Sequence, residues 1–193
     1  MPWPTVLASA SPRRFELLGR LVREFEIDTA DLDEEAFVVP DPVVTAERLA
    51  LAKALAVSER QPGKLVIGGD TVVELEGRQF AKPVSLDDAV DMLLALSGHA
   101  HRVISAVALV WPGGSRVFSE TARVRFRVIS RAEARAYVET GEPMDKAGGY
   151  AIQGGAAPFV TSLEGEMETV IGLPVTRLAA ELRALADEAK GHA

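Results

Sequence analysis

Two long runs of strand-forming residues, 101–110 and 116–129, constrain the fold of this 193-residue chain more than any other feature. A Trp-Pro-Gly-Gly turn at 111–114 separates them, and such a turn between two strand patterns predicts an antiparallel hairpin. Three arginines alternate with apolar residues near the end of the second run. We interpret them as the solvated side of a half-buried strand. Any fold must therefore contain a sheet that is at least partly antiparallel.

Strand and helix patterns alternate through the rest of the chain. Further strands are predicted at 5–10, 25–27 and 65–69, the last running straight into Asp70, with two short ones within 158–171. Helices are predicted at 13–22, 43–60, 85–96, 130–139 and 174–189. No internal repeat or linker interrupts this order. The sequence therefore predicts an α/β fold, a mixed twisted sheet flanked by helices, in a single domain spanning residues 1–193.

Composition and charge narrow the possible functions. Hydrophobic residues make up 48% and charged residues 25%, as in ordinary globular proteins. Cysteine is absent, which excludes a thiolate nucleophile and a zinc–thiolate site. The net charge of −7 argues against nucleic acid as a partner. No signal peptide and no membrane-length apolar run are found, so we expect a cytoplasmic protein without membrane contact.

The segment from Ser9 to Arg14 follows a short buried strand and opens a helix. Pro12 suits the first turn of that helix, where an N–H would lack a partner. Two hydroxyls, free backbone N–H groups and the guanidinium groups of Arg13 and Arg14 then gather at a helix N-terminus. Such a turn can hold an anion, most plausibly phosphate. A capped helix start with two solvated arginines explains the same residues.

Asp70 is the strongest candidate for catalysis. We predict that it lies at the carboxyl end of an apolar strand, directly after Gly68 and Gly69. This is where α/β folds place their ligand sites. A carboxylate there can bind Mg²⁺ or Mn²⁺, and Glu34, from the acidic segment 24–47, could supply a second ligand. The alternatives are a structural aspartate that caps a turn and a solvated acidic loop.

Other polar residues carry weaker signals. Lys53 and Lys82 lie beside these motifs, but a single lysine is usually solvated. His99 and His101 would share one face of a strand and could bind metal, although a packing or hydrogen-bonding role is the better interpretation. Neither a Walker phosphate loop, nor a nucleophile elbow, nor a dinucleotide-binding glycine motif is present.

Several blocks, taken in order, resemble the Maf family of nucleoside triphosphate pyrophosphatases, first associated with septum formation. In one-letter code they are LASASPRR at 7–14, GDTVV at 69–73, KP at 82–83, LSG at 96–98, PMDKAG at 143–148, YAIQG at 150–154 and GLP at 172–174. The resemblance implies two lobes around a central cleft, as in inosine triphosphate pyrophosphatases. It also implies hydrolysis between the α and β phosphates with a divalent metal (Mg²⁺, Mn²⁺ or Co²⁺), and a homodimer.

The resemblance also assigns roles to residues at matching positions. Asp70 would be the catalytic carboxylate and, with Glu34, a metal ligand. The substrate polyphosphate would be bound by Ser9, Arg13, Arg14, Lys53 and Lys82. Family branches differ at three positions, which here hold Arg13, Thr71 and Gln153.

That combination resembles the branch acting on dTTP and UTP. The alternatives are an enzyme for 7-methyl-GTP or another non-canonical nucleotide, and a nucleotide-binding division regulator with little turnover. One departure is plain, because the segment 166–169 lacks the aromatic residues that the family often carries before Gly-Leu-Pro.

Overall fold

A single seven-stranded mixed sheet runs through the computed structural model, which describes residues 2–191. The strand order is β2-β1-β3-β5-β6-β7, and β4 pairs with β3 alone. The strands are β1 (Thr5–Ala8), β2 (Glu26–Ile27), β3 (Leu65–Leu75), β4 (Arg78–Phe80), β5 (Ala100–Trp111), β6 (Gly114–Phe126) and β7 (Val160–Glu164). The α-helices are α1 (Pro12–Gly19), α2 (Pro42–Ser58), α3 (Leu86–Leu96), α4 (Arg131–Val138), α5 (Met167–Ile171) and α6 (Val175–Gly191), with short 3₁₀ turns between them.

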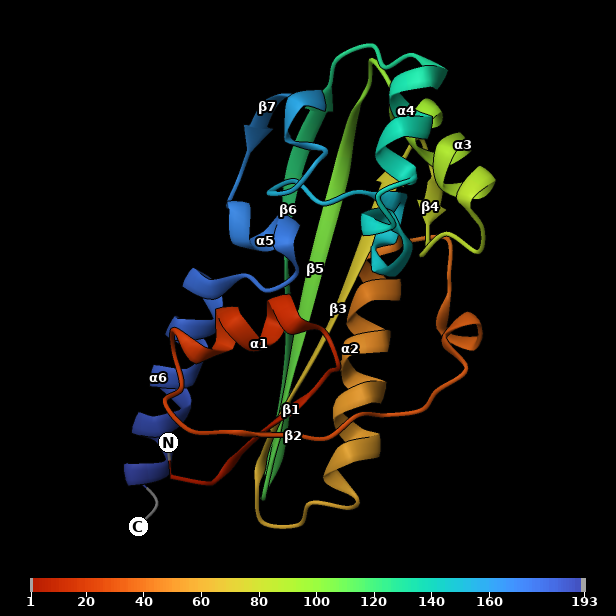
Figure 1. Cartoon of the computed structure of the whole chain (residues 1–193). Coiled ribbons are helices and arrows are strands. Elements are labelled where there is room, and N and C mark those ends of the chain that lie inside the picture. The colour runs from red at the N-terminus through yellow and green to blue at the C-terminus, as the bar shows by residue number, and fades with distance from the viewer. Residues whose placement is uncertain (1, 192–193) are drawn as a thin grey trace.

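The sheet combines a parallel part and an antiparallel part. Strands β2, β1 and β3 are parallel, while β3, β5, β6 and β7 form antiparallel pairs. The predicted hairpin is confirmed, because β5 pairs with β6 from Ala100 opposite Arg125 to Trp111 opposite Gly114. Long, apolar β3 and β5 form the centre of the sheet, and the other elements are arranged around them (Figure 1).

Each face of the sheet has its own core. Helix α2 lies on one face, where its alanines pack against alternate residues of β3 and β5 such as Val66 and Ala106. The opposite face carries two separate clusters. One lies under α1 and α6 around Ile67, and the other lies with α3 and α4 around Val73. These two helix pairs lie at opposite ends of the long hairpin, which gives the molecule two lobes (Figure 1).

The mixed sheet and flanking helices are as predicted, but three local predictions were wrong or incomplete. Strand β3 does not end at Asp70; it continues to Leu75 and turns back into β4, which was not predicted. The segment 158–171 forms one strand and helix α5 rather than two strands. The helix starts were predicted well, since Ser85 and Ser130 are the N-caps of α3 and α4.

His101 is a core residue of the second lobe. Its side chain is 1% exposed, and Nε2 lies 2.8 Å from the hydroxyl of Tyr150 while Phe126 packs edge-on against its ring. Burial lowers the pKa of His101 to about 4. His99 precedes β5 and is exposed, so the two histidines do not share a strand face. For His101 the packing and hydrogen-bonding interpretation is the correct one.

Gly68 allows α2 to approach β3 closely. A Cβ at this position would lie 2.3 Å from the carbonyl oxygen of Ala50 and 2.9 Å from the Cβ of Ala54. We therefore predict that Gly68→Ala lowers the free energy of unfolding by about 1–3 kcal/mol, because the helix must move away from the sheet. Urea denaturation measures this. Gly19→Ala, at the end of α1 with open space around it, is the control and should not destabilise the chain.

The buried imidazole predicts a pH dependence of stability. The unfolded chain takes up a proton near the ordinary pKa of 6.5, whereas folded His101 resists protonation until about pH 4. Stability from this group is therefore complete above pH 6.5 and falls by up to about 3 kcal/mol as the pH approaches 4. Urea denaturation of wild type and His101→Gln between pH 7.5 and 4.5 isolates this loss. A His99→Gln control that flattens the profile equally would contradict the assignment.

Candidate active site

Among residues 2–191, no strand pairs with β3 on one side over residues 69–72. Its parallel neighbour β1 pairs with it only as far as Ala8 opposite Gly68, and β4 begins to pair at Val73 opposite Phe80. On the other side, β5 pairs with β3 without interruption. The stretch 69–72 is therefore an open edge inside the sheet. Side chains from both faces of the sheet can reach a ligand placed there.

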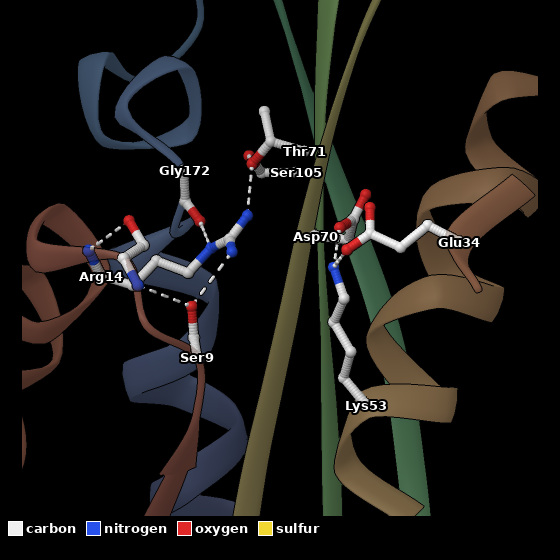
Figure 2. Close-up of polar contacts among 9 residues, drawn as sticks. Ser9, Arg14, Glu34, Lys53, Asp70, Thr71, Ser105 and Gly172 are labelled. Atoms are coloured by element: carbon white, nitrogen blue, oxygen red, sulfur yellow. Dashed lines mark hydrogen bonds and ion pairs between the residues drawn. The ribbon is translucent and has the colours of Figure 1, made fainter. Parts of the chain in front are cut away.

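Successive residues on this open edge direct their side chains to opposite faces of the sheet. Side chains alternate along a strand, so Asp70 points toward α2 while Thr71 points toward α1. Figure 2 shows β3 passing between the two groups of polar side chains. The prediction that Asp70 ends its strand is replaced by a different geometry. Asp70 lies within β3, and the strand beside it, β1, is the one that ends.

Arg14 joins three segments of the chain through its guanidinium group (Figure 2). Nε donates to the carbonyl of Gly172 at 2.9 Å, Nη1 to Oγ of Ser9 at 3.2 Å, and Nη2 to Oγ1 of Thr71 at 3.0 Å. Burial lowers the pKa of Arg14 below its usual value, and the negative charge of Asp70 acts against this effect. The predicted anion turn is thus tied both to β3 and to the turn between α5 and α6.

The hydroxyl groups of Ser9 and Ser11 make different hydrogen bonds. Ser11 is the N-cap of α1, and its Oγ accepts the backbone N–H of Arg14 at 3.4 Å. Ser9 is 8% exposed, and its Oγ accepts from Arg14 and from the backbone of Ser11. The helix-cap explanation is therefore correct for Ser11, while Ser9 belongs to the Arg14 cluster.

Lys53 gathers the carboxylates on the other face of β3. Its Nζ lies 2.7 Å from Oδ1 of Asp70 and 2.8 Å from Oε1 of Glu34. The side chains of Lys53 and Asp70 are 13% and 10% exposed, whereas Glu34, in a 3₁₀ turn, is half-exposed. Partial burial raises the pKa of Glu34, but the hydrogen bond and charge of Lys53 outweigh it, so the net shift is downward. Predicted site residues from three separate segments thus meet at one ammonium group.

The side chains of the remaining predicted site residues are more exposed than those of Asp70 and Lys53. The Arg13 guanidinium on α1 lies 3.8 Å from the carboxylate of Asp145, in the 143–148 motif. Lys82 is exposed in the loop between β4 and α3, and its positive charge contributes to the lowered pKa of Glu34. Gln153 is exposed in the turn that follows Tyr150. None of these three side chains is fully buried, so each remains accessible to a ligand.

The two carboxylates suit a hard divalent cation. Asp70 and Glu34 both hold the same ammonium group, so their oxygens already converge on one cation. Mg²⁺ typically takes one or two carboxylates together with water and substrate phosphates, which matches this donor set. Within residues 2–191, no group of three or more His, Asp or Glu side chains is placed to hold a metal.

Two contributors to this site were not predicted. The buried hydroxyl of Ser105, on β5, lies 2.8 Å from Oγ1 of Thr71. The carbonyl of Gly172 accepts from Arg14, although only the Gly-Leu-Pro motif marked that turn. Ser105 is the one polar residue in the apolar run 103–110, and that isolation was the available signal.

Cationic side chains lie on both sides of the open edge of β3, and two carboxylates converge beside it. These features define an α/β protein suited to a polyanionic ligand. The particular family follows from comparison. The family model described as "Maf-like protein" matches residues 4–185. The chain therefore belongs to the Maf family, and the resemblance found in its motifs is confirmed.

Curated relatives are similar over nearly the whole chain. A protein from Symbiobacterium thermophilum is 46% identical over 89% of each chain, and its name is dTTP/UTP pyrophosphatase. Proteins with the same name from Desulforamulus reducens and Aquifex aeolicus are each 43% identical, covering 93% of this chain and 95% and 94% of theirs. Among solved structures, a HAM1 protein from Coxiella burnetii superposes with a TM-score of 0.52 at 15% identity. It covers 94% of this chain and 99% of its own, and it supports the fold alone.

The buried Lys53–Asp70 pair makes a testable contribution to stability. We predict that Lys53→Met lowers the free energy of unfolding at pH 7 by about 3 kcal/mol, because it leaves a buried carboxylate without its partner. Urea denaturation is the measurement, and adding Asp70→Asn should restore most of the loss. Lys64→Met is the matched control, because it removes a more exposed pair with Glu26 and should cost less than about 1 kcal/mol.

Proposed function

We propose that this protein is a nucleoside triphosphate pyrophosphatase that hydrolyses dTTP and UTP to the monophosphate and diphosphate. The observation that carries the proposal is the shared name of relatives 41–46% identical over most of the chain. The geometry supports it independently. Binding and cleaving a triphosphate calls for cations, a carboxylate and an accessible place in the fold. Arg14, Lys53 and Asp70 meet at the unpaired edge of β3 over residues 69–72.

The polyphosphate is proposed to bind on the α1 side and at the rim of the site. Ser9, Arg13 and Lys82 offer hydrogen-bond donors and positive charge there. Arg14 uses one N–H on each of its nitrogens within the protein, so one N–H on each terminal nitrogen remains for a phosphate oxygen. We assign Arg14 a double role, in which it holds Ser9 and Thr71 in place and also contacts the substrate.

Asp70 is proposed to orient and activate the attacking water. Its carboxylate is almost buried and is fixed by Lys53, so it can accept a proton from a water placed at the open edge. Lys53 then stands within reach of both the carboxylate and the substrate. Attack on the α phosphorus increases the negative charge on the departing diphosphate. The surrounding arginines and lysines stabilise that charge in the transition state.

Asp70 and Glu34 are proposed to hold a divalent cation together with the substrate phosphates. When bound, such an ion (Mg²⁺, Mn²⁺ or Co²⁺) neutralises phosphate charge and makes water more acidic. The Nζ atom of Lys53 lies within ion-pair distance of both carboxylates. We infer that Lys53 turns from Glu34 toward the phosphates when a cation and substrate arrive together.

The proposal also covers the selection of the nucleotide base, the oligomeric state and the cellular location. Arg13, Thr71 and Gln153 are proposed to select the base, in line with the branch of the family that this combination resembles. We also propose that residues 1–193 work as one domain in a cytoplasmic homodimer. Within residues 2–191, no helix has the length and apolar character needed to cross a membrane.

Pyrophosphate release tests the proposed reaction directly. With Mg²⁺, we expect release from dTTP and UTP well above that from CTP, GTP and 7-methyl-GTP, and loss of activity on chelation. Asp70→Asn should lower kcat by about 10²–10⁴-fold, because the amide cannot take the proton from water. The control Asp87→Asn removes an exposed carboxylate on α3, paired with Arg135, and should retain activity.

Three results would each contradict a part of this proposal. A preference for 7-methyl-GTP over dTTP and UTP would assign the protein to another branch of the Maf family. Nucleotide binding without diphosphate release would favour a regulatory role. Wild-type turnover by Asp70→Asn would remove Asp70 from the mechanism.

A further inference from the structure

Ser105 lies behind Thr71 and forms part of a chain of hydroxyl groups. The two residues are directly paired across β3 and β5, and their Oγ atoms are 2.8 Å apart. Ser105 is fully buried. Its Oγ also donates to the carbonyl of Thr169, in α5, at 2.7 Å. The chain thus runs from β3 through β5 to a helix on the same face of the sheet.

The hydrogen of Ser105 is committed to Thr169. At the end of α5, the N–H groups of Gly172 and Leu173 both donate to the carbonyl of Glu168. The Thr169 carbonyl receives no backbone hydrogen bond from the end of this helix, and Thr169 is 1% exposed. A buried carbonyl without a donor is costly. Ser105 supplies that donor, and a serine hydroxyl has only one hydrogen to give.

The direction of the next hydrogen bond follows from this. Because the Ser105 hydroxyl hydrogen is donated to Thr169, the Oγ of Ser105 can only accept a hydrogen bond from the Thr71 hydroxyl. The single hydroxyl hydrogen of Thr71 is therefore donated to Ser105. Arg14 in turn donates to Oγ1 of Thr71 at 3.0 Å. Thr71 therefore has no hydrogen left for a ligand, and its oxygen can offer only a remaining lone pair.

We propose that Ser105 is a positioning residue that fixes Thr71 as a hydrogen-bond acceptor, so that a ligand group facing Thr71 must be a donor. The inference rests on the proposed function. Ionised phosphate oxygens are acceptors, so they do not pair with Thr71. The N3–H of uracil and thymine is a donor, whereas N3 of cytosine is an acceptor. Ser105 thereby favours UTP and dTTP over CTP through the orientation of a single hydroxyl.

The test compares kcat/KM for UTP and CTP, measured by pyrophosphate release, in a double-mutant cycle. Ser105→Ala frees the Thr71 hydroxyl to rotate and donate, so the UTP:CTP ratio should fall about tenfold or more, the scale of one reversed hydrogen bond. In a Thr71→Val background, which has no hydroxyl to orient, adding Ser105→Ala should leave the ratio unchanged.

Each other outcome has a definite meaning. Equal losses on UTP and CTP in Ser105→Ala, or a changed ratio in the Thr71→Val background, would reduce Ser105 to a structural residue and overturn the inference. A wild type that cleaves UTP and CTP equally overturns it together with the proposed base selection, but leaves the proposed hydrolysis between the α and β phosphates intact. A wild type that cleaves neither dTTP nor UTP instead refutes the proposed function. If Ser105→Ala does not fold, Ser105→Cys replaces it in the cycle. Its thiol is a weaker donor and acceptor than the hydroxyl, so the UTP:CTP ratio should still fall, and an unchanged ratio would overturn the inference.

Discussion

The early end of β1 is the constraint on which the site depends. Strand β3 stays paired with β5 along its length, so it keeps its position, but β1 stops opposite Gly68. The chain turns at Ser9 into α1, and this turn places Arg14 across the strand end that β1 leaves. The open edge thus lies in a rigid central strand rather than in a loop. Rigid support of this kind is what keeps catalytic groups within the narrow geometry that they require.

Burying charge on both faces of one strand is costly, and the structure offsets the cost in two ways. On the α2 face, Lys53 neutralises Asp70 directly. On the α1 face, neutral oxygens of Ser9, Thr71 and Gly172 accept the hydrogen bonds of Arg14, which leaves its positive charge without a carboxylate hydrogen-bond partner. The first arrangement neutralises the buried carboxylate, while the second leaves a guanidinium group whose hydrogen bonds go to neutral oxygens. The difference between the faces matches the proposed division between activating water and binding phosphate.

Sequence patterns predicted the order of most elements and named candidate residues that the structure brings together around β3, yet they missed specific placements for physical reasons. Gly68 and Gly69 suggested the end of a strand, but Gly68 is needed for the close approach of Ala50 on α2. The β-branched residues near Thr169 suggested a strand, whereas packing of Met167 and Ile171 against the sheet stabilises a helix there. Ser105 lay within an apolar strand pattern, and its contact with Thr71 depends on strand register, which no local pattern specifies.

The short helix α5 links the proposed ligand-binding residues to the packing of both lobes. Ile171, at its end, packs against the core under α1 and α6 and also against the core with α3 and α4. The next residue, Gly172, accepts from Arg14, while the Thr169 carbonyl accepts from Ser105. One turn of helix therefore fixes both Arg14, which we propose contacts the phosphates, and the hydroxyl chain that ends at Thr71. Because both contacts use backbone carbonyls, they depend on where α5 sits rather than on its side chains. The segment 166–169 can therefore depart from the aromatic residues common in the family without changing either contact.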